Sequence, residues 1–144
     1  LQTTIAEGAS RLIIINEFKG MPGLLKIFDV SPRGYRMISP LLIIKGVRLQ
    51  REFFRKKPKY KMKLLVTTNH QASILEVKLA QELAYAFLGR YVKKLVSLDY
   101  SRASMLIVTK NALSFYELNK ELKQIGPCIN LKKFKLTDEI EAKA

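Results

Sequence analysis

The sequence predicts an α/β domain built from two similar halves, each with a mixed, largely antiparallel sheet and packed helices. Three observations support this fold class. Short apolar runs rich in β-branched residues recur along the chain and are typical of strands. Residues 73–88 have helical periodicity with start and stop signals. Two pairs of short segments resemble each other, which indicates an internal repeat.

The two internal similarities occur in the same order along the chain. Residues 9–14 (Ala-Ser-Arg-Leu-Ile-Ile) resemble residues 103–108 (Ala-Ser-Met-Leu-Ile-Val), and residues 39–49 resemble residues 126–136. The chain has 144 residues, which is enough for one domain with its own core. We therefore predict a single domain over residues 1–144, in which 1–54 are the remainder of a first half, 55–61 a basic connector, 62–137 a second half and 138–144 an acidic tail.

The first half is expected to begin with the end of a helix, residues 1–6, stopped by Gly8. Residues 11–15 contain four consecutive apolar side chains, three of them β-branched, and are expected to form a buried strand. Turn-forming residues at 20–23 and 31–34 separate the elements that follow. The further strands expected in this half are 24–30, 35–39 and 41–49.

The second half is expected to open with a strand at residues 63–67, followed by a helix. This helix has the residues of a capping box, with Ser73 as the N-cap and Glu76 at the third helical position. It is expected to run to Leu88 and to stop at Gly89. Its buried stripe is expected to contain Leu75, Leu79, Leu83, Ala86 and Phe87.

Two interpretations are open for residues 111–125. Residues 113–116 (Leu-Ser-Phe-Tyr) are compatible with a strand, but the apolar residues of the whole segment recur at steps of three and four. Because Thr109 can also cap a helix, we favour a helix that ends at Gly126 and Pro127. The remaining elements expected are an extended segment at 91–98, a core strand at 105–108 and a last strand at 128–136.

The charge of the chain is strongly unbalanced, with 26 Lys and Arg against 12 Asp and Glu and a formal net charge of +14. Such an excess opposes compaction and is typical of proteins with a polyanionic partner. No apolar run approaches the ~20 residues of a spanning helix, and no helical segment pairs a basic face with an apolar one, so nucleic acid is favoured over membrane. We see no signal peptide, and the single cysteine, Cys128, excludes an internal disulfide. A reducing, cytoplasmic location is therefore expected, or a nucleolar one in a eukaryote.

The densest basic segment is residues 45–63, in which nine of nineteen residues are Lys or Arg. These side chains neutralise phosphates and release counterions, so binding is expected to depend steeply on salt. Phe53, Phe54 and Tyr60 lie among them and are candidates to stack on unpaired bases, although both phenylalanines are also candidates to anchor the segment to the core. On the last strand, alternation is expected to place Lys133 and Lys135 on one face and Lys132 on the other. The residues expected to bind nucleic acid are Arg48, Arg51, Arg55, Lys56, Lys57, Lys59, Lys61, Lys63, Lys93, Lys94, Lys133 and Lys135.

The sequence contains no recognisable catalytic or cofactor motif. His70 is the only histidine and is expected to lie in a turn, and Cys128 is the only cysteine, which excludes a His/Cys zinc site. A Walker loop, a dinucleotide fingerprint and a Gly-x-Ser-x-Gly elbow are all missing. We therefore expect no catalytic residue, metal or cofactor. A small nucleic-acid-processing enzyme is the alternative, and it would require four carboxylates to converge in one cleft, those of Glu7, Glu17, Asp29 and Glu76.

Residues 11–23 (Arg-Leu-Ile-Ile-Ile-Asn-Glu-Phe-Lys-Gly-Met-Pro-Gly), followed by 25–28 (Leu-Lys-Ile-Phe), resemble the middle of the Brix domain. That family typically has a hydrophobic strand, a short charged segment, a Gly-Asn-Pro turn and another strand. Met21 stands where the family often has asparagine. Residues 40–49 resemble the strand that closes the first half, and residues 62–136 would then form the second half.

The resemblance implies a function as well as a fold. Brix proteins act in ribosome assembly, bind ribosomal RNA precursors and assembly partners, and are not known as enzymes. The compact length resembles that of archaeal single-domain members, whose two halves are similar α/β units. The family's first strand and helix, with an arginine-rich motif, would precede residue 1. The resemblance thus implies an RNA-binding ribosome-biogenesis factor that acts without catalysis, and a structural ribosomal protein remains a further alternative.

Overall fold

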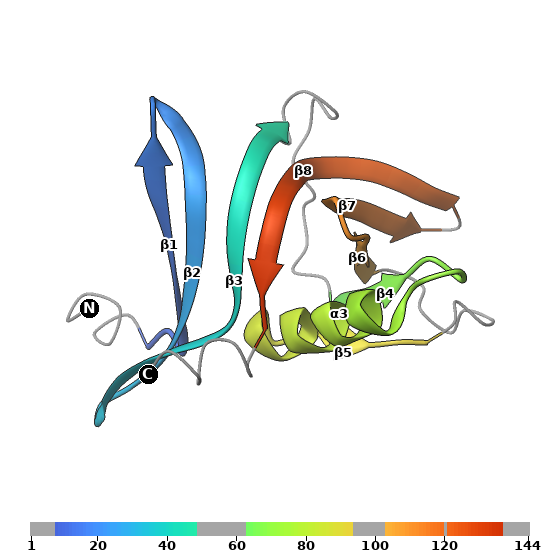
Figure 1. The fold of residues 1–144 in the computed structure, drawn as a ribbon. Helices are drawn as coiled ribbons and strands as arrows, with labels where there is room; N and C mark the ends of the chain where they lie inside the picture. The colour runs from blue at the N-terminus through green and yellow to red at the C-terminus, as the bar shows by residue number, and fades with distance from the viewer. Residues whose placement is uncertain (1–7, 49–62, 94–102, 120, 137–144) are drawn as a thin grey trace.

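The computed structural model describes residues 8–48, 63–93, 103–119 and 121–136. These residues form eight strands and one helix (Figure 1). The elements are β1 (Arg11–Phe18), β2 (Met21–Ser31), β3 (Gly34–Arg48), β4 (Lys63–Thr68), α3 (Ile74–Ala86), β5 (Arg90–Tyr91), β6 (Ala103–Val108), β7 (Ala112–Asn119) and β8 (Glu121–Lys135). The α/β class that the sequence predicts is therefore confirmed.

All the described strands belong to one mixed sheet in the order β1-β2-β3-β8-β7-β6-β4-β5. Two antiparallel meanders, β1-β2-β3 and β6-β7-β8, meet where β3 pairs with β8. Strand β4 then pairs parallel with β6, and β5 pairs parallel with β4. We expected a separate sheet in each half, but the pairing of β3 with β8 joins all the described strands into one continuous sheet. In the described part of the chain, α3 is the single helix packed on it.

The first meander is closed by two short hairpin turns. Lys19 and Gly20 both have positive φ, 51° and 78°, as the mirror-image hairpin turns require, and Met21 already belongs to β2. The turn expected at residues 20–23 therefore lies slightly earlier in the chain. The turn expected at 31–34 is confirmed, because Ser31 pairs with Gly34. The two strands expected at 35–39 and 41–49 form one continuous strand, β3.

Helix α3 covers one face of the sheet and encloses the main core (Figure 1). The buried side chains of this core come from six strands and from α3, and they include Ile27, Leu42, Val66, Leu79, Leu83, Leu106, Leu113 and Leu131. A smaller buried cluster on β4, β6 and β7 consists of Leu65, Ala103, Met105 and Leu118. Because Leu65 alternates with Val66 and Met105 with Leu106, this second cluster lies on the opposite face. These three strands are thus buried on both faces.

The start of α3 is formed as the sequence predicts. The Ser73 hydroxyl accepts a hydrogen bond from the Glu76 backbone N–H (3.2 Å), and the Ser73 N–H donates to the Glu76 carboxylate (3.4 Å). The expected buried stripe is correct for Leu79, Leu83 and Ala86, and Phe87 is partly buried against the core. Leu75, in the first turn, was expected to be buried but is 50% exposed, because the buried surface of α3 begins one turn later.

The end of α3 differs in detail from the prediction. The helix ends at Ala86, and Leu88 rather than Gly89 has the left-handed backbone, with φ of 58°. Glycine is required at position 89 for a different reason. A Cβ atom there would lie 2.8 Å from the carbonyl oxygen of Leu64, so the chain after the helix passes against β4 more closely than a side chain permits.

The helix favoured for residues 111–125 is wrong, because this segment forms β7 and the first part of β8. Leu113 and Phe115 pack on the α3 side, while Tyr116 and Leu118 pack on the other side. A strand buried on both faces does not alternate simply, and its apolar residues here mimic a helical spacing. The Thr109 hydroxyl accepts from the Ala112 N–H (3.0 Å), as an N-cap would, but it closes a hairpin turn between β6 and β7.

The strand expected at residues 11–15 is confirmed as β1, but it is not buried. Ile13, Ile14 and Ile15 are 46%, 39% and 53% exposed. Among the described strands β1 pairs only with β2 and lies at the edge of the sheet, on the side away from β4 and β5 (Figure 1). β-Branched residues favour strands without specifying whether a strand is central or at an edge.

Several predicted segments lie outside the described residues: the helix end at 1–6, the connector at 55–61, most of the extended segment at 91–98 and the tail at 138–144. In the part of the chain that the structure describes, no helix is long and apolar enough to cross a membrane.

Candidate nucleic-acid interface

Predicted RNA-binding lysines of β8 lie on the face of the sheet opposite α3, which we call the distal face. Leu42 of β3 packs in the core under α3, so its neighbours Leu41 and Ile43 point to the distal face. Ile43 pairs with Lys133, and Leu41 pairs with Lys135. Since cross-strand partners share a face, both lysines point away from α3. Lys133 is exposed and Lys135 is half-buried.

Two β-bulges lie on either side of the Ile44–Leu131 pair. The extra residue is Lys132 in β8 and Lys45 in β3, and both side chains are exposed. A bulge redirects the side chain that it inserts. The strict alternation expected for Lys132 and Lys133 is therefore interrupted. This pair of bulges concentrates basic side chains where the two central strands meet.

Arg48 and Lys63, the described residues that flank the basic connector, also belong to the distal face. Arg48 follows Val47, which packs against the α3-side core, and Arg48 is exposed. Lys63 lies two residues before Leu65 on β4, so it points to the same face as Leu65, which belongs to the smaller buried cluster on the distal face. Lys63 is exposed as well. Arg48 is on β3 beside β8, whereas β4 is four strands away from β3, or about 19 Å across the sheet. Lys63 thus shares the face without being adjacent to Arg48.

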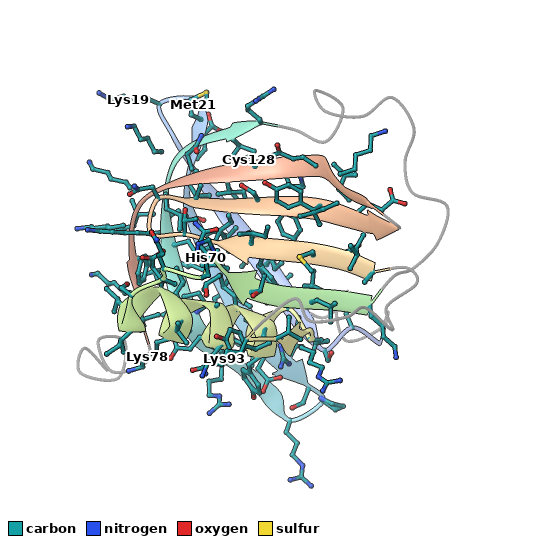
Figure 2. The ribbon with its side chains drawn as sticks, turned by 90° about the vertical axis from the view of Figure 1, so that its right-hand side faces the viewer. Lys19, Met21, His70, Lys78, Lys93 and Cys128 are labelled. Carbon is teal, nitrogen blue, oxygen red and sulfur yellow. The ribbon has the colours of Figure 1, made fainter. Side chains whose placement is uncertain are left out.

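The other predicted residues are not brought into this group. Lys93 follows β5, the last described strand on the far side of the sheet from β3. Figure 2 shows Lys93 and Lys78 in the lower part of the view, where α3 lies, and Cys128 of β8 near the top. Seven predicted residues lie outside the described part of the chain, namely Arg51, Arg55, Lys56, Lys57, Lys59, Lys61 and Lys94.

A cavity of about 540 Å³ lies between β3, β8 and the turn from β6 to β7. Its lining residues are Lys45, Gly46, Asn111, Asn130 and Leu131. Lys45 belongs to the basic segment 45–63, and the other four were not expected to bind a ligand. The signal in the sequence was Gly46 within a strand, because an isolated strand glycine often marks a bulge. The asparagines carried no signal, since only the strand register brings them together.

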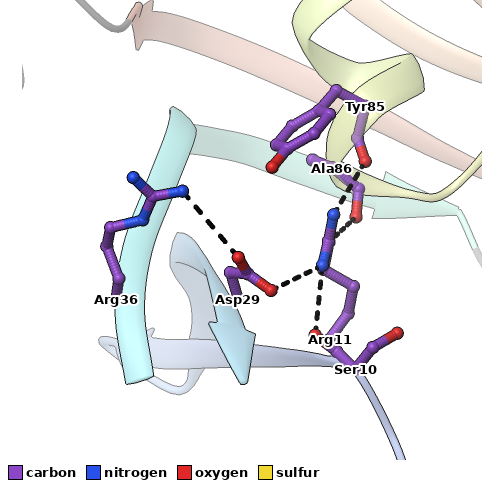
Figure 3. Close-up of polar contacts among 6 residues, drawn as sticks. All are labelled: Ser10, Arg11, Asp29, Arg36, Tyr85 and Ala86. Atoms are coloured by element: carbon purple, nitrogen blue, oxygen red, sulfur yellow. Dashed lines mark hydrogen bonds and ion pairs between the residues drawn. The ribbon is translucent and has the colours of Figure 1, made fainter. Parts of the chain in front are cut away.

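The most extensive polar cluster of described side chains, centred on Arg11, is structural. The Arg11 guanidinium donates to the carbonyl oxygens of Ala86 (3.1 Å) and Tyr85 (3.3 Å) and to the Asp29 carboxylate (2.8 Å), as Figure 3 shows. It also lies 5.1 Å from the centre of the Tyr85 ring. The last turn of α3 has no basic residue of its own, so Arg11 supplies the positive charge that its carbonyl groups favour. We call this arrangement the Arg11 clamp, and it fastens β1 and β2 to α3.

Of the four carboxylates that a nuclease would need, the three that the structure describes lie apart. Asp29 binds Arg11, and Glu76 takes part in the capping box of α3. Arg11 is the strand partner of Asp29, and Glu17 lies six residues after Arg11, about 20 Å along β1. Glu7 lies outside the described residues. Across the described ranges, no three His, Cys, Asp or Glu side chains are placed to hold a metal ion.

The two other candidate reactive residues have structural surroundings. His70 lies in a turn closed by a hydrogen bond from the Ala72 N–H to the Asn69 carbonyl (3.0 Å), and the turn expected there is confirmed. Cys128 is half-buried in β8, with its sulfur 3.5 Å from the hydroxyl of Ser114.

No protein-family model matches the chain, but individual proteins do. It is 31% identical over 140 residues to a protein of Pyrococcus abyssi named probable Brix domain-containing ribosomal biogenesis protein, covering 87% of this chain and 62% of the relative. A protein of the same name from Thermococcus kodakarensis is also 31% identical, with 87% and 66% covered. The one from Methanopyrus kandleri is 27% identical over 157 residues, with 96% and 78% covered. The chain thus spans just under two thirds of the first two relatives.

Solved structures have the same fold. A probable ribosomal biogenesis protein from Aeropyrum pernix superposes with a TM-score of 0.67 at 21% identity, covering 92% of this chain and 72% of that one. Mil, an archaeal Imp4-like protein, superposes with a TM-score of 0.51 at 13% identity, covering 95% and 76%. At these identities the likeness concerns the fold alone.

Proposed function

The chain belongs to the Brix-domain family of ribosomal biogenesis proteins, and from this premise we propose that it is an RNA-binding factor of ribosome assembly. The proposed ligand is ribosomal RNA or its precursor, which the protein binds and does not cleave. The observation that carries the proposal is the common distal placement of Arg48, Lys133 and Lys135 on β3 and β8. Assembly proteins are possible further partners, and the proposed location is the cytoplasm.

A basic sheet face suits RNA for a physical reason. β3 and β8 are central, hydrogen-bonded strands, so the positions of their side chains are set by a rigid backbone. Arg48 pairs with Cys128, and Lys135 pairs with Leu41, seven residues along β3 and about 23 Å away. Charges distributed over this length can contact several successive phosphates. Each contact releases counterions, which gives affinity without sequence preference.

The basic connector extends the proposed interface. Its five basic residues (Arg55, Lys56, Lys57, Lys59 and Lys61) and the preceding Arg51 lie outside the described part of the chain and remain predicted RNA contacts. Arg48 and Lys63, which flank it in the sequence, both lie on the distal face. An RNA bound to that face would therefore pass the described residues that precede and follow the connector in the sequence. This supports a single interface to which the sheet and the connector both contribute.

We also infer that the two meanders belong to related halves, residues 1–54 and 62–137. The similar segments 9–14 and 103–108 cover the start of β1 and the whole of β6, the first strands of their meanders. The similar segments 39–49 and 126–136 fall on β3 and β8, which are the last strands and pair with each other. The two meanders are thus arranged about the β3–β8 pair in the same internal order, as a duplicated unit would be.

The test is a titration of ribosomal RNA fragments at several salt concentrations. We expect tight binding at low salt and a steep loss as salt rises. Replacing Arg48, Lys133 and Lys135 together by alanine should lower the slope of log affinity against log salt by about 2, at about 0.7 per phosphate contact on a single strand. Arg33→Ala is the control, because it removes an exposed positive charge in the β2–β3 turn that is not among the residues expected to bind nucleic acid.

The same titration tests the connector and the absence of turnover. Replacing Arg55, Lys56, Lys57 and Lys59 by alanine should weaken binding to all RNA fragments, because phosphate contacts are independent of sequence. RNA recovered after incubation with Mg²⁺ should be intact. Unchanged affinity and slope in both multiple variants would reject the proposed interface, and RNA cleavage by the purified protein would reject a role without catalysis.

A further inference from the structure

We propose that the cavity between β3, β8 and the β6–β7 turn is a nucleotide pocket that selects one unpaired base of the bound RNA. This inference rests on the proposed function and adds base selectivity to it. The bulge at Lys45 inserts one residue into β3 between the pairs Ile44–Leu131 and Gly46–Asn130. The sheet is therefore locally irregular at this point, and the cavity of about 540 Å³ lies there. Its volume is within the range of small-molecule sites, roughly 300–1,000 Å³.

The asparagine side chains provide the chemistry of base recognition. Each amide has both a donor and an acceptor, which matches the mixed donor and acceptor edge of a nucleobase. Asn130 lies between Ile129 and Leu131, which both pack on the α3-side core, so its side chain points to the distal face. Asn111 is held beside it, because its backbone carbonyl accepts a hydrogen bond from the Leu131 N–H at 2.7 Å.

The cavity also has space in front of Asn130. Gly46 is the strand partner of Asn130, and a Cβ atom at position 46 would lie 4.0 Å from the Asn130 amide nitrogen. Glycine at this position leaves the amide accessible from the β3 side. The backbone of Gly46 does not have a positive φ, so its conformation does not itself require glycine. The absence of a side chain at Gly46, rather than its backbone conformation, therefore leaves the space in the pocket.

The charges around the cavity favour a nucleotide over other small ligands. Lys45 supplies a positive charge in the lining, and no described lining residue carries a carboxylate. Arg48 lies two residues beyond Gly46 on β3, and Lys133 lies on the other side of Asn130 along β8. A strand of RNA that crosses the distal face would thus have phosphate contacts before and after the pocket. The base between them would be within reach of both asparagines.

The experiment compares four oligoribonucleotides, each of about eight identical nucleotides, a length within the usual single-strand site size. Their affinities are measured by fluorescence anisotropy at low and moderate salt. We expect the parent protein to prefer one of the four. Asn130→Ala should weaken binding of the preferred oligonucleotide by about 5–20-fold, the lower part of the range for a well-placed base contact, and leave the least preferred unchanged.

Gly46→Val tests the pocket by steric exclusion, since it fills the space and keeps every polar group. It should abolish the preference while leaving the salt dependence intact. Asn16→Ala, which removes an exposed amide on β1, is the control and should keep the preference of the parent. Circular dichroism checks that each variant is folded. If a variant is not folded, Asn130→Asp is used in its place, because it is an isosteric change at an exposed position. Its negative charge should weaken binding of the preferred oligonucleotide further by charge repulsion.

The outcomes separate the pocket from the function on which it rests. Salt-dependent binding with equal affinity for all four oligonucleotides, or with a preference that survives both Asn130→Ala and Gly46→Val, would overturn the pocket and leave the RNA-binding role standing. Failure of the parent protein to bind any of the oligonucleotides and any ribosomal RNA fragment at low salt would overturn the role itself.

Discussion

The first strands of the two meanders have similar apolar sequences and very different surroundings. In β6, Met105, Leu106 and Val108 are fully buried, whereas in β1 Ile13 and Ile15 are about half exposed. The difference comes from their neighbours. β6 is flanked by β7 and β4 and is covered by α3, while β1 has only β2 beside it among the described strands. A run of β-branched and aliphatic residues therefore predicts a strand, but its position in the sheet decides whether the strand contributes to the core.

Truncating matched leucines in the two strands should give the largest difference. Leu106 and Leu12 occupy equivalent places in the internal similarity, but Leu106 is fully buried and Leu12 only half-buried. Leu106→Ala should lower the free energy of unfolding by about 2–5 kcal/mol, because it leaves a cavity in the core. Leu12→Ala should cost less than half as much. Urea denaturation measures the free energy of unfolding of both variants. Equal losses of free energy would contradict the inference that β6 contributes more to the core than β1.

The Arg11 clamp ties β1 and β2 to α3, so its removal should have an intermediate effect. Arg11→Ala should lower the free energy of unfolding by about 1–3 kcal/mol, as expected for charge-assisted hydrogen bonds that are partly buried. The comparison is Arg36→Ala, which removes a 3.8 Å ion pair with Asp29 from a side chain that is 72% exposed. Its effect should be below about 0.5 kcal/mol. Similar values for the two variants would show that the contacts with α3 contribute little.

The smallest effect on stability is expected at the exposed edge. Ile15→Lys should change the free energy of unfolding by less than about 0.5 kcal/mol, because Ile15 lies on an edge strand and is about half exposed. The lysine should also reduce association between copies, since charged residues on an edge strand oppose pairing. Sedimentation velocity at high salt measures this second effect. A strong loss of stability would mean that β1 is covered in solution.

Local signals in the sequence were sufficient where a few neighbouring residues determine the structure. Ser73 and Glu76 predict the start of α3, because both partners of the capping box lie within one turn. Thr109 shows the limit of such signals, since its hydroxyl makes the bond of an N-cap within a hairpin turn. Residues 112–119 form a strand that is buried on both faces, so its apolar residues do not alternate simply and their spacing resembles that of a helix. That burial depends on distant elements and cannot be inferred from periodicity alone.

The candidate site divides in the same way. Composition indicates a polyanion partner, and alternation correctly groups Lys133 with Lys135 on one face. The bulges at Lys45 and Lys132 depend on how β3 pairs with β8, and these two lysines lie 87 residues apart in sequence. The cavity beside Asn130 depends on the same register. Its two asparagines carry no local signal, so only the folded structure brings them together.

The edge of β1, which has no second partner among the described strands, and the charge of the chain together have a consequence for the protein in bulk solution. An exposed apolar edge can template pairing between copies, but a formal net charge of +14 keeps the copies apart. At physiological ionic strength this repulsion is screened beyond about 8 Å, so it acts mainly at close approach. A polyanion that neutralises the chain removes the same barrier. Colloidal stability is therefore governed by the ratio of protein to polyanion, with a minimum near charge balance.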